Sequence, residues 1–253
     1  TADASHPVFS PDGRWIAYVR GNQLFKIRIE GGVPEPLGTA PGTFAGMSWS
    51  TAGRIILSGA VAMYTIPEGG GTPVPLMTPG AAAGRDPTVS SPVAWDEAGV
   101  LLYSTWSGGS IQSARIAIAS LDGTRATTLE LPGTQPVGVI DGVLVYVTST
   151  GTLMGVPIDL RRRELSGAPV QLVTDIRTNL TTGIARAVMS RTGTLMYERG
   201  SQLSRVVVAA PGGVKRVLLA EPREYAFPRL SPDGTALAVT IRLDGRRDIW
   251  VYD

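Results

Sequence analysis

The segment Ser10-Pro11-Asp12-Gly13 returns intact as Ser231-Pro232-Asp233-Gly234 near the other end of the chain. Proline presets φ inside such a turn and glycine accepts a positive φ, so the segment predicts a tight turn between two strands. Degenerate copies lie between the two: Ser50-Thr51-Ala52-Gly53, Asp96-Glu97-Ala98-Gly99, Val139-Ile140-Asp141-Gly142 and Ser190-Arg191-Thr192-Gly193. The six glycines are 40, 46, 43, 51 and 41 residues apart, which is the period of a four-stranded propeller blade.

Apolar strands flank every copy of this turn. A short strand such as Pro7-Val8-Phe9 precedes it, and a longer one such as Trp15–Val19 follows it. A third apolar strand and a fourth, more polar strand complete the repeat, while helical periodicity is nearly absent apart from a short turn at 159–165. The regular period favours a propeller over the rival interpretations, a β-sandwich or an open array.

We therefore predict an all-β fold: a six-bladed β-propeller of four-stranded antiparallel blades in a single domain, 1–253. The predicted blades cover residues 5–40, 43–79, 90–132, 135–175, 183–221 and 225–253. The last blade stops at Asp253, on its third strand, and therefore lacks its outer strand in this chain. Since numbering starts at Thr1 without a methionine, we expect the chain to be part of a longer protein.

The composition of the chain argues against several classes of function. Hydrophobic residues make up 43% of the chain, enough for a sizeable core without disulfides, and cysteine is absent. The net charge of +2 comes from scattered residues, mostly arginines, so no phosphate-tracking stripe predicts nucleic-acid binding. No apolar run approaches the length of a membrane span, so we expect no membrane insertion by this domain.

The turn and the strand after it resemble the TolB-like, WD40-like propeller repeat. The resemblance is closer to the propeller that follows the kinase domain and membrane span of many bacterial serine/threonine protein kinases. Four segments carry it: Gln23–Ile27 with Gly31-Gly32; Met154–Leu160 with Glu164–Gly167; Gly193–Tyr197; and Pro228–Gly234 with Arg246–Asp253. The resemblance implies an extracytoplasmic (periplasmic or cell-surface) sensor or interaction domain. No kinase motif is present, so in a kinase parent the chemistry would lie elsewhere.

The chain offers little for catalysis or metal binding. A Ser-His-Asp triad would need His6, the single histidine, and no Gly-x-Ser-x-Gly elbow is present. We expect His6 to be satisfied in the fold or to line the central channel, where it could contact a ligand. One histidine and no cysteine exclude ordinary zinc sites, and the calcium-loop pattern is missing. We predict no catalytic residue, no metal and no cofactor.

The loops opposite the Ser-Pro-Asp-Gly turns are the better candidates for binding, because loops hold binding residues on a rigid scaffold. Exposed Trp, Tyr and Arg side chains are the types that anchor interfaces. Trp106 is equally compatible with packing between blades, whereas Trp15, Trp49, Trp95 and Trp250 fit core positions. The binding candidates are His6, Arg20, Asn22, Arg85, Asp86, Trp106, Arg177, Asn179, Tyr225, Arg242 and Asp244.

Two functional hypotheses follow. The first is a non-catalytic sensor or interaction domain, from a membrane-bound kinase, which binds a protein or a small extracellular ligand on the loop face or at the channel mouth. The second is an enzyme: either a hydrolase or lyase with a site at the channel mouth, or the accessory propeller of a prolyl-oligopeptidase-type peptidase. Flanking gene sequence would separate them. The oligomeric state is not indicated by any pattern.

Overall fold

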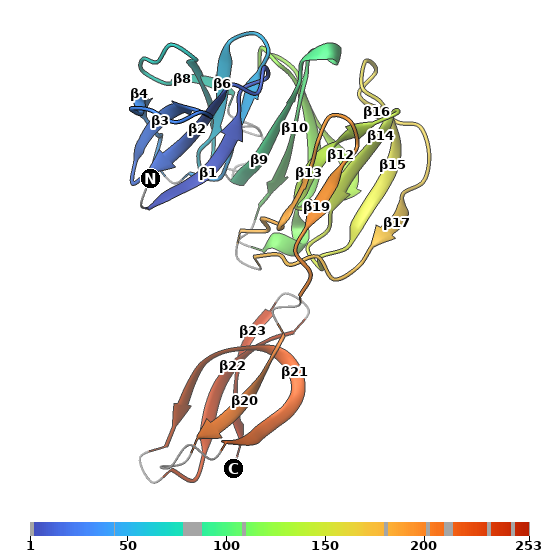
Figure 1. The fold of residues 1–253 in the computed structure, drawn as a ribbon. Helices are drawn as coiled ribbons and strands as arrows, with labels where there is room; N and C mark the ends of the chain where they lie inside the picture. The colour runs from blue at the N-terminus through green and yellow to red at the C-terminus, as the bar shows by residue number, and fades with distance from the viewer. Residues whose placement is uncertain are drawn as a thin grey trace. The chain divides into compact units, whose positions relative to one another are not determined.

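The computed structural model describes residues 3–42, 44–77, 88–107, 110–179, 182–200, 203–209, 215–231, 234–243 and 246–252. These residues form antiparallel strands and two single 3-10 turns, η2 (Asp96–Ala98) and η3 (Ile111–Ser113), which confirms the all-β prediction (Figure 1). The chain divides into two compact units, Thr1–Glu198 and Arg199–Asp253. No helix in the described part of the chain is long and apolar enough to cross a membrane.

Four consecutive antiparallel sheets form most of the first unit, and their strands follow the order of the chain. In sheet one the order is β1 (Ala4–Phe9), β2 (Trp15–Arg20), β3 (Gln23–Arg28) and β4 (Glu35–Thr39). Sheet two contains β5 (Met47–Ser50), β6 (Arg54–Ser58), β7 (Met63–Pro67) and β8 (Val74–Met77). Sheet three contains β9 (Thr88–Trp95), β10 (Val100–Trp106), β11 (Arg115–Ser120) and β12 (Ala126–Pro132). Sheet four contains β13 (Gln135–Ile140), β14 (Val143–Val147), β15 (Leu153–Asp159), β16 (Glu164–Leu165) and β17 (Val170–Val173).

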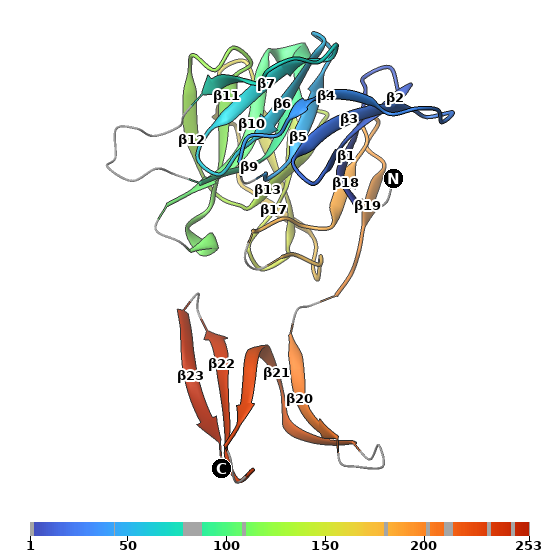
Figure 2. The ribbon, with the colours of Figure 1, turned by 90° about the vertical axis from the view of Figure 1, so that its left-hand side faces the viewer.

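The fifth repeat begins in the first unit with a two-stranded sheet, β18 (Ala187–Met189) paired with β19 (Leu195–Tyr197). The second unit is one sheet of β20 (Ser204–Ala209), β21 (Lys215–Leu230), β22 (Leu237–Leu243) and β23 (Arg246–Tyr252). Figure 2 shows these four strands side by side. The predicted outer strand of blade five and inner strand of blade six are thus one continuous strand, β21.

The turn motif has the predicted scaffold role. Gly13 has φ 70° and its N–H donates to the Ser10 carbonyl over 2.9 Å. The Ser10 hydroxyl donates to Asp12 Oδ1 over 2.6 Å and accepts from the Trp15 N–H over 2.9 Å. The same glycine-to-carbonyl hydrogen bond recurs at Gly53, Gly99, Gly193 and Gly234. These side-chain and backbone bonds satisfy the polar groups of the turn and hold two strands of each pair together.

The core of the first unit lies between neighbouring sheets, where apolar faces pack on one another. One buried cluster joins sheets one and two around Trp49 and Leu57, and a second joins sheets two and three around Met63 and Tyr103. Further clusters join sheet three to sheet four and sheet four to the β18–β19 pair. Face-to-face packing of successive four-stranded sheets is the architecture of a propeller. The described residues form six sheets, but only four of these sheets are the consecutive complete repeats that we expected, so the count of six blades is not confirmed. The single-domain limits stay a prediction.

The segment 159–165, expected as a short turn, is a β-hairpin. Ile158 pairs with Leu165 and Asp159 pairs with Glu164, so the turn between them extends β15 rather than starting a helix. Asp159 Oδ1 accepts hydrogen bonds from the backbone N–H groups of Arg161 and Arg162, each over 3.0 Å. An aspartate that binds the backbone two and three residues ahead stabilises a turn, which accounts for this local structure.

Candidate functional site

The first strands of the sheets share a kink at corresponding positions. His6 has φ 52°, Ser91 has φ 53° and Gly46 has φ 125°. Strands β1 and β9 change register close to these residues, as expected of β-bulges. A proline follows both non-glycine residues, and this residue lacks the N–H that a continuous ladder would require. The kinks therefore release His6 and Ser91 from regular pairing on the inner strands.

A depression of about 280 Å³ lies where these inner strands converge in the first unit. It is lined from all five repeats of that unit: His6, Pro7, Val8, Ala45, Gly46, Met47, Ser91, Pro92, Val93, Gln135, Pro136, Val137, Ile184, Ala187 and Val188. We refer to it as the channel depression. Its described lining is mainly apolar and contains no Asp, Glu, Lys or Arg. Such a surface suits a small uncharged ligand oriented by few polar groups.

His6 is the titratable side chain of this lining. It is half-buried, and burial lowers the pKa of its imidazole below the usual 6.5. Nδ1 lies 3.1 Å from Ser5 Oγ, and the Phe44 ring meets the imidazole edge-on at 4.9 Å. An Nδ1–H that donates to Ser5 would leave Nε2 as a proton acceptor. A neutral histidine at neutral pH can act as a general base.

Gln135 and Ser91 supply the other polar side chains of the channel depression. The Gln135 side chain helps to hold neighbouring repeats together. Its Oε1 accepts from the Ala185 N–H over 2.7 Å, and its Nε2 donates to the Ala187 carbonyl over 3.1 Å. Both ends of the amide are thus used to tie β13 to the fifth repeat. The Ser91 N–H donates to the Ala45 carbonyl over 3.1 Å and ties the third repeat to the second. These bonds fix the walls around His6.

A second, larger cavity of about 560 Å³ lies further along the same inner strands, toward the turns that follow them. Val8, Val93, Val137 and Val188 line both cavities. The larger one also contains Trp95, over whose ring the Arg191 guanidinium lies at 5.4 Å. Arg191 makes ion pairs with Asp96 at 3.6 Å and Glu97 at 3.2 Å, so its charge is already balanced.

Among the predicted binding residues, the structure places His6 in the channel depression. Arg20 lies at the end of β2, where its guanidinium stacks over the Phe25 ring at 4.7 Å. Asn22 lies in the β2–β3 turn, and its carbonyl accepts from the Ala40 N–H over 2.7 Å. Trp106 ends β10 and is half-buried. None of these three lines the depression.

The remaining candidates are also dispersed. Arg177 forms an ion pair with Glu198 at 2.7 Å, and Asn179 Oδ1 accepts from the Thr182 N–H over 3.1 Å. In the second unit, Tyr225 donates to the Glu221 carbonyl over 3.0 Å. Arg242 belongs to β22, but its side chain lies outside the description, as do the residues Arg85, Asp86 and Asp244. The role of these candidates in binding stays a prediction.

Sequence reasoning missed Ser91 and Gln135, although a signal was present. A residue followed by proline recurs at the start of the inner strands as His6-Pro7, Ser91-Pro92, Gln135-Pro136 and Phe227-Pro228. Proline is confined to edges and bulges in sheets, so its repeated presence at this position marks the kinked residues.

The donor set of the depression does not fit calcium, which requires several oxygen ligands, usually including carboxylates. Over the described ranges no group of three or more His, Cys, Asp or Glu side chains is placed to hold a metal ion. We therefore derive no step through a metal.

Comparison with known proteins shows the fold. No protein-family model matches the chain, and no curated protein matches it. A gluconolactonase from Xanthomonas campestris superposes with a TM-score of 0.58 at 13% identity, covering 98% of this chain and 84% of that one. The calcium-binding protein regucalcin from Agrobacterium tumefaciens gives 0.55 at 15% identity, with 94% and 81% covered. The β-propeller domain of Cps50 (Swd1) from Myceliophteria thermophila gives 0.55 at 13%, with 98% and 83% covered. The chain thus has a β-propeller-like fold.

These comparisons correct two functional expectations. The main hypothesis, a non-catalytic sensor or interaction domain of a membrane kinase, is contradicted, because the fold is shared with a gluconolactonase. The expectation that this domain is no enzyme is contradicted by the same finding. The error arose because turn and strand motifs such as Ser-Pro-Asp-Gly specify the scaffold, and a scaffold of this kind hosts many functions. The extracytoplasmic location and the partner classes stay predictions.

Proposed function

We propose that the chain is a hydrolase of small uncharged esters, lactones included, and that the channel depression is its site. The observation that carries the proposal is the environment of His6, a half-buried imidazole in an otherwise uncharged depression, with its pKa lowered by burial. The shared fold with a protein named as a gluconolactonase supports this reaction class.

The reaction needs a base and a confined substrate. Nε2 of His6 would take a proton from water while the water oxygen attacks the carbonyl carbon. The carbon–oxygen bond of the ester then breaks, and the leaving alkoxide recovers the proton from the imidazolium. We expect an uncharged substrate, because the described lining has no Asp, Glu, Lys or Arg side chain that could pair with a charged group of the substrate. A volume of about 280 Å³ limits the substrate to a small molecule.

The test measures the hydrolysis of a panel of small neutral lactones and esters by pH-stat titration. Free imidazole serves as the control catalyst. His6→Gln is expected to lower kcat/KM by about 100-fold, the lower end of what a positioned base contributes. Arg20→Gln, outside the depression, is the matched control and should leave the rate unchanged. Equal rates in the wild type and His6→Gln would contradict the proposal.

The pH profile provides a second readout. A base works in its neutral form, and burial lowers the pKa of His6 below 6.5. The rate should therefore fall only as the pH drops through the lowered pKa, and it should reach its plateau at a lower pH than a base with the usual histidine pKa of 6.5 would allow. A rate that still rises steeply above pH 7 would show that a group other than His6 is the base.

A further inference from the structure

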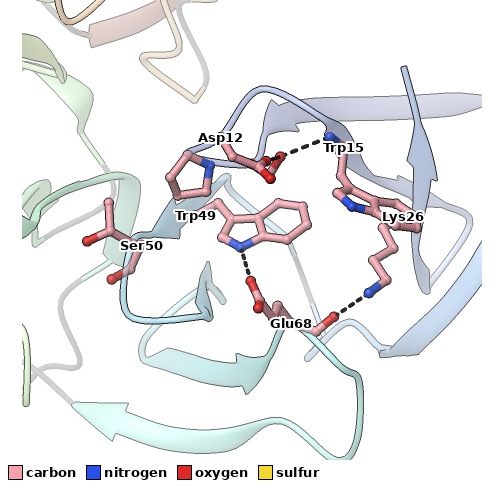
Figure 3. A pocket seen from close by; sticks show the side chains of 9 residues that line it. Asp12, Trp15, Lys26, Trp49, Ser50 and Glu68 are labelled. Carbon is pink, nitrogen blue, oxygen red and sulfur yellow. Dashed lines mark hydrogen bonds between the residues drawn. The ribbon is translucent and has the colours of Figure 1, made fainter. Parts of the chain in front are cut away.

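A separate cavity of about 280 Å³ opens between sheets one and two, on the side of the Ser-Pro-Asp-Gly turn (Figure 3). It is lined by Ser10, Pro11, Asp12, Trp15, Lys26, Trp49, Ser50, Thr51 and Glu68. We refer to it as the Trp15–Trp49 crevice. It shares none of its lining residues with the channel depression.

Two indoles supply the apolar part of the crevice. Trp49 is only 6% exposed, and its Nε1–H donates to Glu68 Oε2 over 3.1 Å, which fixes the ring. Trp15 is half-buried, and two cations lie over its ring: Lys26 Nζ at 4.7 Å and the Arg28 guanidinium carbon at 4.5 Å from the ring centre. Figure 3 shows the Trp49 ring between the Asp12 and Glu68 side chains and the Trp15 ring beside the Lys26 side chain.

Two carboxylates flank Trp49, with Asp12 and Glu68 on opposite sides of its ring in Figure 3. Asp12 uses Oδ1 to accept from Ser10 Oγ over 2.6 Å and from the Arg14 N–H over 3.0 Å. The Ser10 hydrogen bond also lowers the pKa of Asp12, so this carboxylate stays charged. Within the described residues, Asp12 is bonded through Oδ1 and Glu68 through Oε2, which leaves Oδ2 of Asp12 and Oε1 of Glu68, beside Gly53, as further acceptors.

Lys26 is the cation in the wall of the Trp15–Trp49 crevice, and neighbouring groups largely neutralise its charge. Lys26 donates to the Glu68 carbonyl oxygen over 2.9 Å and forms an ion pair with Glu35 at 3.5 Å. Its side chain is 15% exposed, and an ammonium has three donors, so one can serve a ligand oxygen. Among the side chains that line the crevice, Asp12 and Glu68 carry carboxyl groups and only Lys26 carries a cation, so the lining favours a neutral or cationic group over an anion.

The equivalent crevice between sheets two and three is a natural control. It has a similar volume of about 290 Å³ and also contains a turn aspartate, Asp122. Its lining residues, Ser50, Ala52, Arg54, Ile56, Thr65, Leu121 and Asp122, include no aromatic side chain. The combination of two indoles with two carboxylates is thus not imposed by the packing of neighbouring sheets.

We propose that the Trp15–Trp49 crevice binds a single neutral or amino-sugar ring. The C–H groups of a pyranose pack on indole surfaces, and its hydroxyl groups donate to the open oxygens of Asp12 and Glu68. The Lys26 ammonium donates to a sugar oxygen. The cavity volume limits the occupant to one ring rather than an extended oligosaccharide.

The experiment is an NMR and calorimetric titration of the chain with glucose, glucosamine, glucuronate and the acyclic polyol sorbitol. Glucose and glucosamine should bind in the millimolar range and shift the indole N–H signal of Trp49. Glucuronate should bind at least about 10-fold more weakly, because its carboxylate meets two others. Sorbitol should also bind more weakly, because it lacks a rigid apolar ring face.

Glu68→Gln should weaken glucosamine binding by about 10-fold, the effect of losing one hydrogen bond to a charged group. Asp122→Asn, in the crevice without aromatic residues, is the matched control and should bind like the wild type. Lys26→Met keeps the apolar stem and gives a second variant if Glu68→Gln unfolds. Absence of sugar binding, equal affinity for glucuronate, or unchanged affinity in both crevice variants would overturn the proposal.

Discussion

Sheets one to three and the fifth repeat have the same kind of turn between their first two strands but differ in what surrounds it. The central strands of the first four sheets are buried, as Leu102 and Leu144 show with 0% exposure. In the fifth repeat β19 has only three residues, and Met196 on it is 65% exposed. In the described structure β19 pairs only with β18. The comparison teaches that the turn motif specifies an inner hairpin, whereas a complete sheet also requires apolar neighbours on both faces.

The largest effect should come from truncating two leucines, one in a complete sheet of the first unit and one in the second unit. Leu102→Ala removes a fully buried side chain of sheet three and should cost about 3–4 kcal/mol of unfolding free energy. Leu230→Ala removes one that is 60% exposed on β21 and should cost less than about 1 kcal/mol. Denaturant unfolding monitored by circular dichroism measures both. Equal costs would mean that β21 is buried as deeply as the complete sheets.

An intermediate effect is expected at two turn glycines. Gly123 has φ 73°, and a Cβ there would lie 2.3 Å from the Leu76 carbonyl oxygen of sheet two. Gly193, in the β18–β19 turn, has φ 85°, and its nearest neighbour would be the Ile140 side chain at 3.4 Å. Both alanine variants carry the strain of a positive φ, about 1 kcal/mol, but only Gly123→Ala must also displace backbone.

Thermal unfolding should therefore show a larger loss for Gly123→Ala than for Gly193→Ala. The difference measures how tightly complete sheets pack on one another. If Gly193→Ala is the more damaging variant, the fifth repeat is packed more closely than its exposed strand indicates.

The sequence was sufficient to predict the turns and strands that depend on the chemistry of a few neighbouring residues. Turn glycines such as Gly13 need a positive φ, and the strand predicted at Trp15–Val19 lies within one residue of the bounds of β2. The continuous strand β21 was not predicted, because the repeat spacing favoured a break between two blades. Whether a strand continues depends on its partners along the ladder: β20 pairs with the first part of β21, and β22 pairs with its last part.

The candidate sites also divide into features that could be predicted from the sequence and features that could not. His6 was predicted to line the channel because it precedes an inner strand. Trp15 and Trp49 were predicted as core, and both do pack with the cluster of sheets one and two. Their convergence with Glu68 was not predictable, because Lys26 and Glu68 are 42 residues apart and meet only through the packing of two sheets.

The smallest effect is expected at the ion pairs that link the β18–β19 turn to sheet three. Arg191 contacts both Asp96 and Glu97, but its own side chain is 46% exposed, so water and salt screen the attraction. Arg191→Gln should cost less than about 1 kcal/mol, and the cost should shrink in high salt. Arg162→Gln, which removes a 79% exposed partner of Asp159, is the control and should cost still less. A larger, salt-independent loss for Arg191→Gln would show that stacking on Trp95, rather than charge, attaches the fifth repeat to sheet three.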